Sequence, residues 1–498
     1  MNRIGQLIDG KRTSDKGSRT GPVYNPATGE QIAEVELADT KTVTSATEAA
    51  QAAFEEWSSR TPINRARVMF RYKELVSAHI DELAELVSRE HGKTLDDARG
   101  SITRGIEVIE FACGVPQLLK GEYSANVGTG VDSFNLRQPL GVCVGITPFN
   151  FPAMVPLWMM PVALVCGNTF ILKPSEKDPS CPMRLIELAH EAGCPEGVVN
   201  VVNGDKEAVD ALLTDPHVQA VSFVGSTPIA EYIFHTGTAN NKRVQALGGA
   251  KNHMIVMPDA DIGGVTDALI GSAFGSAGER CMAISLAVCV GDETSDRVRD
   301  SVVEAASKLK IGPYTDTDSD YGPLNTRAHL DKVLGYIEKG EQEGAKLVAD
   351  GRGTSLQGYE DGYFLGPCVF DHVTPDMTIY KEEIFGPVLG IVRTEQYGEA
   401  LSLVNQHELG NGAALFTNNG GVARHFIERS KIGMVGVNVP IPVPVAYHSF
   451  GGWKRSLFGD HHMHGPEGIR FYTKLKTATL TWPTGEKAGP EFSIPTLS

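Results

Sequence analysis

The segment Gly141-Val142-Cys143-Val144-Gly145-Ile146-Thr147 opens the series of short apolar runs that decides the fold. Segments with helical patterns, 182–192 among them, lie between the runs. The series continues at intervals of roughly 20–30 residues, the period of βαβ units, with runs at 169–172, 198–202, 220–224 and 243–247. We therefore expect a parallel sheet covered by helices, the arrangement of a Rossmann-like unit.

Upstream of this series, the chain has the periodicity of amphipathic helices. Apolar side chains recur at helical spacing over 43–57 and over 68–87, with charged residues on the other side. The second run ends at Gly92, a residue type that suits a helix C-cap. A third helix is predicted over 94–114.

Two further patterns complete the predicted elements. Gly, Ser and Asn clusters around a short alternating run predict a β-hairpin over 121–138. The last segment, 470–482, is predicted as an exposed edge strand, and pairing with the hairpin would make an oligomerisation element. Beyond Gly249 a second α/β region is predicted, with a helix over 326–343 and strands at 254–256, 286–290, 389–392 and 433–438.

Length and composition narrow the class of protein. A chain of 498 residues exceeds what one hydrophobic core usually organises, so we expect two or three domains. The net charge of −16 argues against a nucleic-acid surface and favours a soluble protein. We find no signal peptide and no membrane span. The 8 cysteines have neither CxxC pairs nor regular spacing, so we expect no metal site and no disulfide framework, but a cytoplasmic location.

Cys281 is the first candidate for chemistry. It ends the small-residue stretch Gly275-Ser276-Ala277-Gly278-Glu279-Arg280-Cys281 and precedes an apolar strand. Because the thiolate is the reactive form of cysteine, a neighbouring cation such as Arg280 would raise its population. For an isolated cysteine, a buried structural role is the ordinary alternative.

Polar residues also follow the predicted strands of the first half, and the carboxyl ends of parallel strands are where such folds bind ligands. Asn150 lies in Thr147-Pro148-Phe149-Asn150-Phe151-Pro152, and its amide could donate to a developing oxyanion. Lys173 and Glu176 could bind ribose hydroxyls, and Glu176 would repel a 2′-phosphate. Gly225-Ser226 opens a helix and suits a pyrophosphate. Each pattern, taken singly, is also compatible with an ordinary turn.

Together these segments resemble the aldehyde dehydrogenase superfamily over nearly the whole chain. The order and separation of the motifs carry the resemblance: 147–152, 173–176, 225–226, Leu247-Gly248-Gly249, the Cys281 segment and Glu382-Glu383-Ile384-Phe385-Gly386-Pro387-Val388. It implies that Cys281 forms a thioester and that the Asn150 side chain and the Cys281 N–H make an oxyanion hole. It also implies NAD as cofactor, with contacts from Thr147, Pro148, Phe149, Lys173, Glu176, Gly225, Ser226, Glu383 and Phe385.

The resemblance implies an α/β fold with three parts. We expect a Rossmann-like NAD-binding domain from 1–118 and 141–249, and an α/β catalytic domain from 250–450. Residues 119–140 and 466–498 would form a small β oligomerisation element. A homotetramer built as a dimer of dimers is implied by the family in the same way.

One departure from the family pattern concerns the acyl acceptor. Hydrolytic members carry a Glu before Leu-Gly-Gly, and this Glu activates the water that cleaves the thioester, whereas here the residue is Ala246. A positioned general base contributes ~10²–10⁴ in rate, so hydrolysis is expected to be slow. A thiol needs less activation because it is already partly ionised. Ala246 therefore points to coenzyme A as co-substrate.

Two arginines point to an acidic substrate. Arg280 adjoins the nucleophile, and the resemblance places Arg104 along the substrate tunnel, where guanidinium groups would bind a carboxylate. Together with 246–253, 451–460 and 465–474, they resemble the methylmalonate-semialdehyde (malonate-semialdehyde) dehydrogenases, which are CoA-acylating. That resemblance implies oxidative decarboxylation of methylmalonate or malonate semialdehyde with NAD and CoA, which yields propionyl-CoA or acetyl-CoA, CO₂ and NADH.

Two alternatives stay open. One is a hydrolytic NAD-dependent dehydrogenase of another acidic semialdehyde, against which Ala246 counts. The other is a catalytically silent protein that keeps the fold, against which Cys281 and Asn150 count. The choice between the two semialdehydes is open because one methyl group changes binding by only ~1–3 kcal/mol. The pathway is open too, with valine catabolism as one of several.

Overall fold

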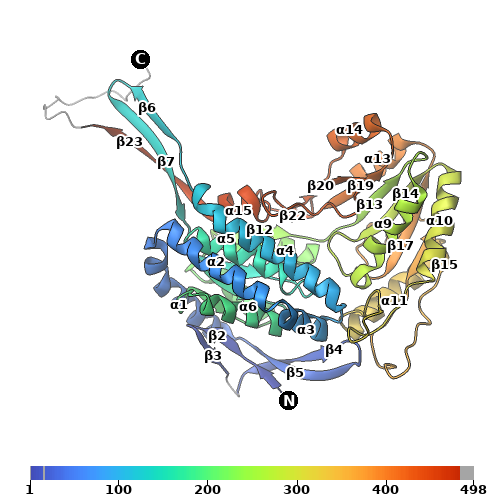
Figure 1. The fold of residues 1–498 in the computed structure, drawn as a ribbon, viewed down its shortest axis with the longest axis horizontal. Coiled ribbons are helices and arrows are strands. Elements are labelled where there is room, and N and C mark those ends of the chain that lie inside the picture. Colours follow the sequence, from blue (N-terminus) through green and yellow to red (C-terminus); the bar gives the residue numbers. More distant parts are fainter. Residues whose placement is uncertain (1, 15–16, 483–498) are drawn as a thin grey trace.

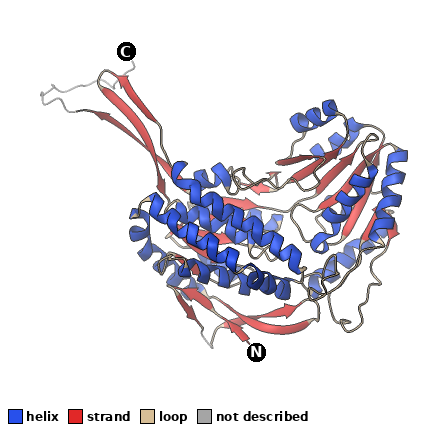
Figure 2. Cartoon of the chain, in the orientation of Figure 1, coloured by secondary structure: helices blue, strands red, loops and turns tan. Residues whose placement is uncertain are grey.

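A computed structural model of the chain describes residues 2–14 and 17–482. Figures 1 and 2 show two α/β bodies beside each other and a narrow three-stranded arm that projects from the first of them. Residues 1 and 15–16 of the predicted NAD-binding domain, and 483–498 of the predicted oligomerisation element, lie outside the described residues. In the described part of the chain, no helix has both the length and the apolar character needed to cross a membrane.

The larger sheet forms the centre of the first body. Its strand order is β22-β12-β11-β8-β9-β10-β2-β3. The five strands from β12 to β10 are parallel, as the apolar runs predict, and antiparallel strands flank them on both sides. The strands are β2 Gln6–Ile8, β3 Lys11–Thr13, β8 Val142–Ile146, β9 Thr169–Lys173, β10 Val199–Val201, β11 Val218–Val224, β12 Arg243–Leu247 and β22 Leu457–Phe458.

Helices cover both faces of this sheet. On one face, an apolar core forms between β8, β11 and the helices α1 Thr40–Ser59, α7 Lys206–Thr214 and α8 Thr227–Ala239. The run at 68–87 is two helices, because His79 leaves helical geometry, and the second ends as predicted at Gly92 with φ of 99°. The larger core contains α2 Pro62–Ala78, α3 Ile80–His91, α4 Leu95–Gly114, η1 Val115–Gln117, α5 Met154–Val165, α6 Ser180–Glu191 and α15 Gly465–Phe471.

The second body has its own sheet and its own apolar core. The strand order is β15-β16-β17-β14-β13-β19-β20, with all neighbours parallel except β15 and β16. The strands are β13 Asn252–Val256, β14 Ile284–Val290, β15 Lys346–Ala349, β16 Cys368–Asp371, β17 Val388–Thr394, β19 Gly412–Phe416 and β20 Met434–Val437. The helices are α9 Ile262–Phe274, η2 Gly275–Gly278, α10 Asp292–Ala306, α11 Arg327–Gln342, α12 Thr378–Lys381, α13 Tyr397–Gln406 and α14 Gly420–Arg429.

The projecting arm contains the predicted hairpin and the predicted last strand. β6 Tyr123–Gly128 and β7 Val131–Pro139 form the hairpin, and β23 Thr473–Thr481 pairs antiparallel with β7. The sequence patterns did not predict the small sheet β1-β5-β4, with β1 Asn2–Ile4, β4 Arg19–Asn25 and β5 Glu30–Leu37, or the pair β18 Leu409–Gly410 and β21 Trp453–Lys454.

Candidate active site

A cleft of about 710 Å³ opens at the carboxyl ends of β8, β9, β11 and β12, where side chains of both bodies face it. The first body contributes residues that directly follow or end these strands, which is where parallel sheets bind ligands. Arg104 and Arg280 do not line this cleft. The other predicted site residues do, namely Thr147, Pro148, Phe149, Asn150, Lys173, Glu176, Gly225, Ser226, Cys281, Glu383 and Phe385.

Cys281 reaches the cleft through an unusual turn. Ser276, Ala277 and Gly278 have φ of 54°, 53° and 74°. A Cβ at Gly278 would lie 2.1 Å from the carbonyl oxygen of Gly386, so this position requires glycine both for its φ and for its close approach. The turn places Cys281 between α9 and β14, at the wall of the cleft.

The backbone after the nucleophile is held by two amide side chains. Asn252 and Asn411 both donate from Nδ2 to the carbonyl oxygen of Cys281, at 2.9 and 3.0 Å. Asn252 also donates to the carbonyl oxygen of Ala283 and accepts from the N–H of Gly412. The orientation of Cys281 is therefore set by buried hydrogen bonds rather than by loop conformation alone.

The surroundings of Cys281 raise the pKa of its thiol. Burial raises its pKa to about 12, and the Glu383 carboxylate adds to the rise. Arg280 lowers this pKa, but burial outweighs it, and the guanidinium itself donates to Asp97 at 2.7 Å. Arg280 thus acts in the predicted direction, but its effect on the pKa is smaller than that of burial.

Asn150 follows β8 and its amide points at the segment that carries Cys281. Its side chain is buried, and Nδ2 donates to the carbonyl oxygen of Glu279 at 2.9 Å. The backbone carbonyl oxygen of Asn150 accepts a hydrogen bond from Nζ of Lys93 at 2.8 Å. An amide fixed in this way can donate to charge that develops on a substrate oxygen.

The Leu247-Gly248-Gly249 turn connects the two walls of the cleft. Thr227 accepts from the N–H of Gly249 at 2.9 Å, and Glu383 accepts from the N–H of Ala250 at 2.8 Å. A Cβ at Gly249 would lie 2.4 Å from Oε2 of Glu383, so glycine lets this carboxyl group approach. Burial raises the pKa of Glu383 to about 7.

Ala246 is fully buried in β12, where it pairs with Phe458 of β22. The methyl group belongs to the apolar core beneath the turn. Position 246 therefore contributes neither a carboxylate nor any other polar group to the reaction.

The far end of the cleft has the features of a phosphate site. Gly225 and Ser226 precede α8, and a Cβ at Gly225 would lie 2.4 Å from the Phe223 ring. The Ser226 side chain makes no capping hydrogen bond, so the first-turn N–H groups of α8 are open to an anion. Within the described part of the chain, Oγ1 of Thr147 is buried and has no hydrogen-bond partner.

Lys173 and Glu176 line the same cleft. Their charged atoms are 3.4 Å apart, and the Lys173 side chain is buried whereas that of Glu176 is partly exposed. The contact is too long for a strong ion pair, so both groups retain hydrogen-bonding capacity for the hydroxyls of a ligand.

The two arginines already have carboxylate partners. Arg104 contacts Glu107 at 2.5 Å and donates to the carbonyl oxygen of Pro444 at 2.6 Å. Arg280 donates to Asp97 at 2.7 Å, and both guanidinium groups are partly exposed. Their charges therefore do not require a substrate anion for compensation. Each retains further N–H groups, because a guanidinium has five.

The sequence patterns missed the buried charged groups behind the nucleophile. Glu279 is fully buried 3.6 Å from both His91 and His329, and burial raises its pKa to about 8. Lys93 is buried and Asp97 is partly exposed near it, at the start of α4. Spacing of four residues at a helix start is typical of an exposed pair, so the sequence held no signal of burial.

Comparison with known proteins agrees with this geometry. Residues 13–478 match the aldehyde dehydrogenase family. The chain is 57% identical to a malonate-semialdehyde dehydrogenase of Pseudomonas aeruginosa over 100% of both chains, and 48% identical to one of Geobacillus kaustophilus over 97% and 99%.

Solved structures agree as well. A methylmalonate-semialdehyde dehydrogenase of Oceanimonas doudoroffii is 58% identical and superposes with a TM-score of 0.96 over 97% of this chain and 99% of that one. A Sinorhizobium meliloti chain in complex with NAD has the same TM-score and coverage at 56% identity. With its nucleophile turn, Asn150 and the Leu-Gly-Gly turn around one cleft, the chain belongs to the aldehyde dehydrogenase family.

Proposed function

We propose that this enzyme oxidises and decarboxylates malonate semialdehyde or methylmalonate semialdehyde, with NAD as oxidant and CoA as acyl acceptor. The products are acetyl-CoA or propionyl-CoA, CO₂ and NADH. The observation that carries the proposal is the 57% identity over the full chain to a malonate-semialdehyde dehydrogenase, together with one cleft that holds Cys281, Asn150 and Glu383.

The residues of the cleft fit NAD. The pyrophosphate would bind at the N-terminus of α8, where Gly225 leaves room that a Cβ would fill. The partnerless hydroxyl of Thr147 offers a further donor in the same cleft. Lys173 and Glu176 would bind ribose hydroxyls, and Glu383 the nicotinamide ribose. Pro148, Phe149 and Phe385 would supply apolar contact.

Cys281 and Asn150 carry the chemistry in this proposal. The sulfur of Cys281 bonds to the aldehyde carbon, and the thiol proton passes to solvent water as the bond forms. The Asn150 amide and the Cys281 N–H donate to the oxygen that becomes negative. NAD, when bound, accepts the hydride that this adduct loses on its way to an acyl thioester on Cys281.

The substrate carboxylate selects the substrate and later leaves. Arg104 and Arg280 would bind it through N–H groups that Glu107 and Asp97 do not use. Once the thioester has formed, its carbonyl accepts the electron pair of the bond between carbon and carboxylate, and CO₂ departs. A proton then replaces CO₂ on the carbon, which leaves an acetyl or propionyl group on Cys281.

Ala246 accounts for the choice of acceptor. Its buried methyl group offers no base to activate water. The CoA thiol attacks the thioester carbon, its sulfur takes the acyl group, and the Cys281 sulfur leaves with a proton. The thiol requires little activation because it is partly ionised at neutral pH.

We also propose a domain division, an oligomeric state, a cellular location and a pathway for this enzyme. The division into 1–118 and 141–249, 250–450, and 119–140 with 466–498 is supported by two separate sheets and a projecting arm. The exposed edge of β23 supports assembly into a tetramer through the arm. All 8 cysteines are free thiols, which supports a cytoplasmic location. Valine catabolism is one pathway that supplies such a substrate.

Trapping the acyl-enzyme tests the covalent part of the proposal. The enzyme is mixed with malonate semialdehyde and NAD without CoA, quenched, and analysed by intact mass and peptide mapping. We expect one acetyl group on Cys281 and none on the buried Cys289, which serves as the matched control. An unmodified Cys281 after one equivalent of NADH has formed would contradict the proposal.

A further inference from the structure

A chain of three charged side chains runs behind the cleft from Asn150 to the residue before Cys281; Lys93 is buried, and Asp97 and Arg280 are partly exposed. Lys93 donates from Nζ to the carbonyl oxygen of Asn150 at 2.8 Å, and the same Nζ lies 3.8 Å from Asp97. Asp97 accepts from Arg280 at 2.7 Å. The charges alternate along this chain, and the two cations, Lys93 and Arg280, share the single carboxylate of Asp97.

The surroundings leave Lys93 little freedom. Its side chain is fully buried and its ammonium group lies 4.2 Å from the centre of the Phe151 ring. A buried cation without a partner is costly, and here the partners are the Asn150 carbonyl, the Phe151 ring and Asp97. Lys93 therefore ties the backbone of the Asn150 segment to the start of α4.

Arg280 ties the nucleophile segment to the same helix. Its guanidinium folds back against the η2 turn, and a Cβ at Gly275 would lie 2.6 Å from its Nη1. Asp97 lies in the first turn of α4, where its N–H donates to Thr94 at 3.3 Å and the helix dipole favours a negative charge. One carboxylate thus connects the segment of Asn150 with the segment of Cys281.

We propose that Lys93, Asp97 and Arg280 act as positioning residues that hold the Asn150 amide and the Cys281 N–H in the relative geometry that receives the oxyanion. The Asn150 amide also donates directly to the Glu279 carbonyl oxygen, so the two segments meet at two places. A displacement of about 1 Å in either donor weakens transition-state stabilisation. This inference rests on the proposed function, because the oxyanion forms only if Cys281 attacks an aldehyde.

Assays with an uncharged and with a charged aldehyde distinguish the positioning role of these residues from binding of the substrate carboxylate. The variants K93M and D97N are assayed with propanal and with malonate semialdehyde, each with NAD and CoA. We expect kcat for propanal to fall roughly tenfold in both variants with KM little changed, because the lost interaction acts in the transition state. The double variant K93M/D97N should lose about as much as the worse single variant, since the residues act as one unit.

Two exposed residues provide matched controls. Asp96 precedes Asp97 on the same helix and pairs with Arg99 at the surface, and Lys73 pairs with Glu110. D96N and K73M should keep the wild-type kcat, and their double variant should be additive. Thermal unfolding is recorded for every variant. Should D97N fail to fold, K93M retains the pair of Asp97 with Arg280 and still reports on the Asn150 side.

The outcomes distinguish the inference from the function beneath it. Wild-type enzyme that fails to turn over malonate semialdehyde would overturn the proposed function. Active wild type, with K93M and D97N lowered in thermal midpoint but equal to D96N in kcat for propanal, would overturn the positioning role alone. A loss confined to malonate semialdehyde would also overturn it, because the chain would then serve only carboxylate binding.

Discussion

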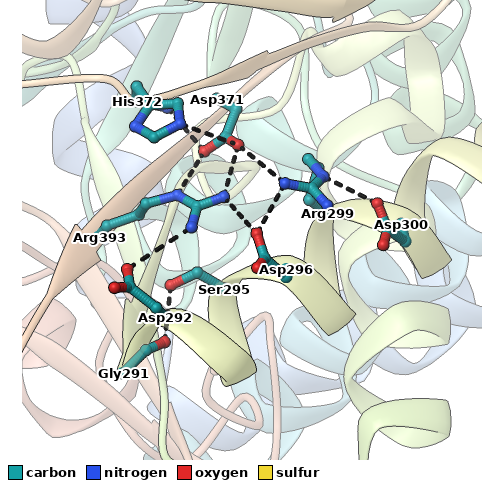
Figure 3. A network of polar contacts seen from close by, with 9 residues as sticks. All are labelled: Gly291, Asp292, Ser295, Asp296, Arg299, Asp300, Asp371, His372 and Arg393. Carbon is teal, nitrogen blue, oxygen red and sulfur yellow. Dashed lines mark hydrogen bonds and ion pairs between the residues drawn. The ribbon is translucent and has the colours of Figure 1, made fainter.

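Two networks of charged side chains in this molecule differ in how many of their polar atoms have hydrogen-bond partners. In the second body, Figure 3 shows Arg393 of β17 between Asp371 of β16 and two carboxylates of α10. Arg393 contacts Asp371 at 2.7 Å and Asp296 at 2.8 Å, and Arg299 contacts Asp296 at 2.7 Å. Burial works to raise the pKa of Asp371, but hydrogen bonds from Arg393 outweigh it and lower the pKa.

The network behind the cleft includes more deeply buried groups, and more of its polar atoms lack hydrogen-bond partners. Among the residues that the structure describes, Oδ2 of Asp97, Oε2 of Glu279 and both ring nitrogens of His91 have no hydrogen-bond partner. Buried groups in this condition cost stability, and proteins keep them where function requires them. We infer that the Arg393 network serves to join α10 to its sheet, and that the cleft network serves the reaction.

The largest expected effect belongs to the cleft. Asn150→Ala removes the amide donor to the oxyanion, so kcat should fall by ~10²–10³ while the unfolding midpoint changes little. Steady-state NADH formation and calorimetry on the same preparation measure both. A fall in stability with unchanged kcat in the folded fraction would reverse the assignment of the two networks.

Asp371→Asn should have the opposite effect: it should lower stability and leave kcat unchanged. It removes the carboxylate that Arg393 and Arg299 share, and this carboxylate is 2% exposed. The free energy of unfolding should fall by about 2–3 kcal/mol, less than for a fully enclosed pair because Arg393 is partly exposed. Urea unfolding measures the loss, and kcat should stay at the wild-type value. Lost catalysis in folded protein would mean that this network also reaches the site.

The pH dependence of stability sharpens the comparison further. Burial raises the pKa of Glu279 from 4.5 to about 8, so the folded protein keeps a proton that the unfolded chain releases. The free energy of unfolding contributed by this group therefore falls as pH rises from about 4.5 to about 8. Glu279→Gln should remove that fall, so its free energy of unfolding relative to wild type should rise by up to about 4 kcal/mol between pH 5 and pH 8. Parallel stability curves for the two proteins would disprove a neutral Glu279.

The smallest effect is expected at the rim of the Arg393 network. Asp292 is 89% exposed and lies 3.6 Å from Arg393. Exposed pairs contribute little, so Asp292→Asn should change the free energy of unfolding by less than about 0.5 kcal/mol. Comparison with Asp371→Asn in the same urea titration isolates the effect of burial. Equal losses in the two variants would show that burial does not govern this network.

Much of the fold could be predicted from sequence because burial on both faces makes central parallel strands continuously apolar. The runs at 169–172 and 243–247 became β9 and β12 with nearly the predicted bounds. The small sheet β1-β5-β4 could not be predicted, because β4 is largely exposed and has no apolar alternation. The strand β19 is short and lies in a Gly- and Ala-rich stretch, so its pattern was equally weak.

The candidate site could be predicted where residues follow strands and could not where charges come together through tertiary contact. Asn150, Lys173 and Gly225 stand at strand ends, and they line one cleft. The bond between Asp97 and Arg280 joins residues 183 positions apart, which no local pattern reveals.

The most direct test of the central claim is NADH formation from malonate semialdehyde at saturating NAD, with and without CoA, while acetyl-CoA is followed by mass. We expect steady turnover only with CoA, and one acetyl-CoA for each NADH, because the buried Ala246 offers water no base. Equal steady turnover without CoA, with release of free acetate, would contradict it and would require another group in the cleft to activate water.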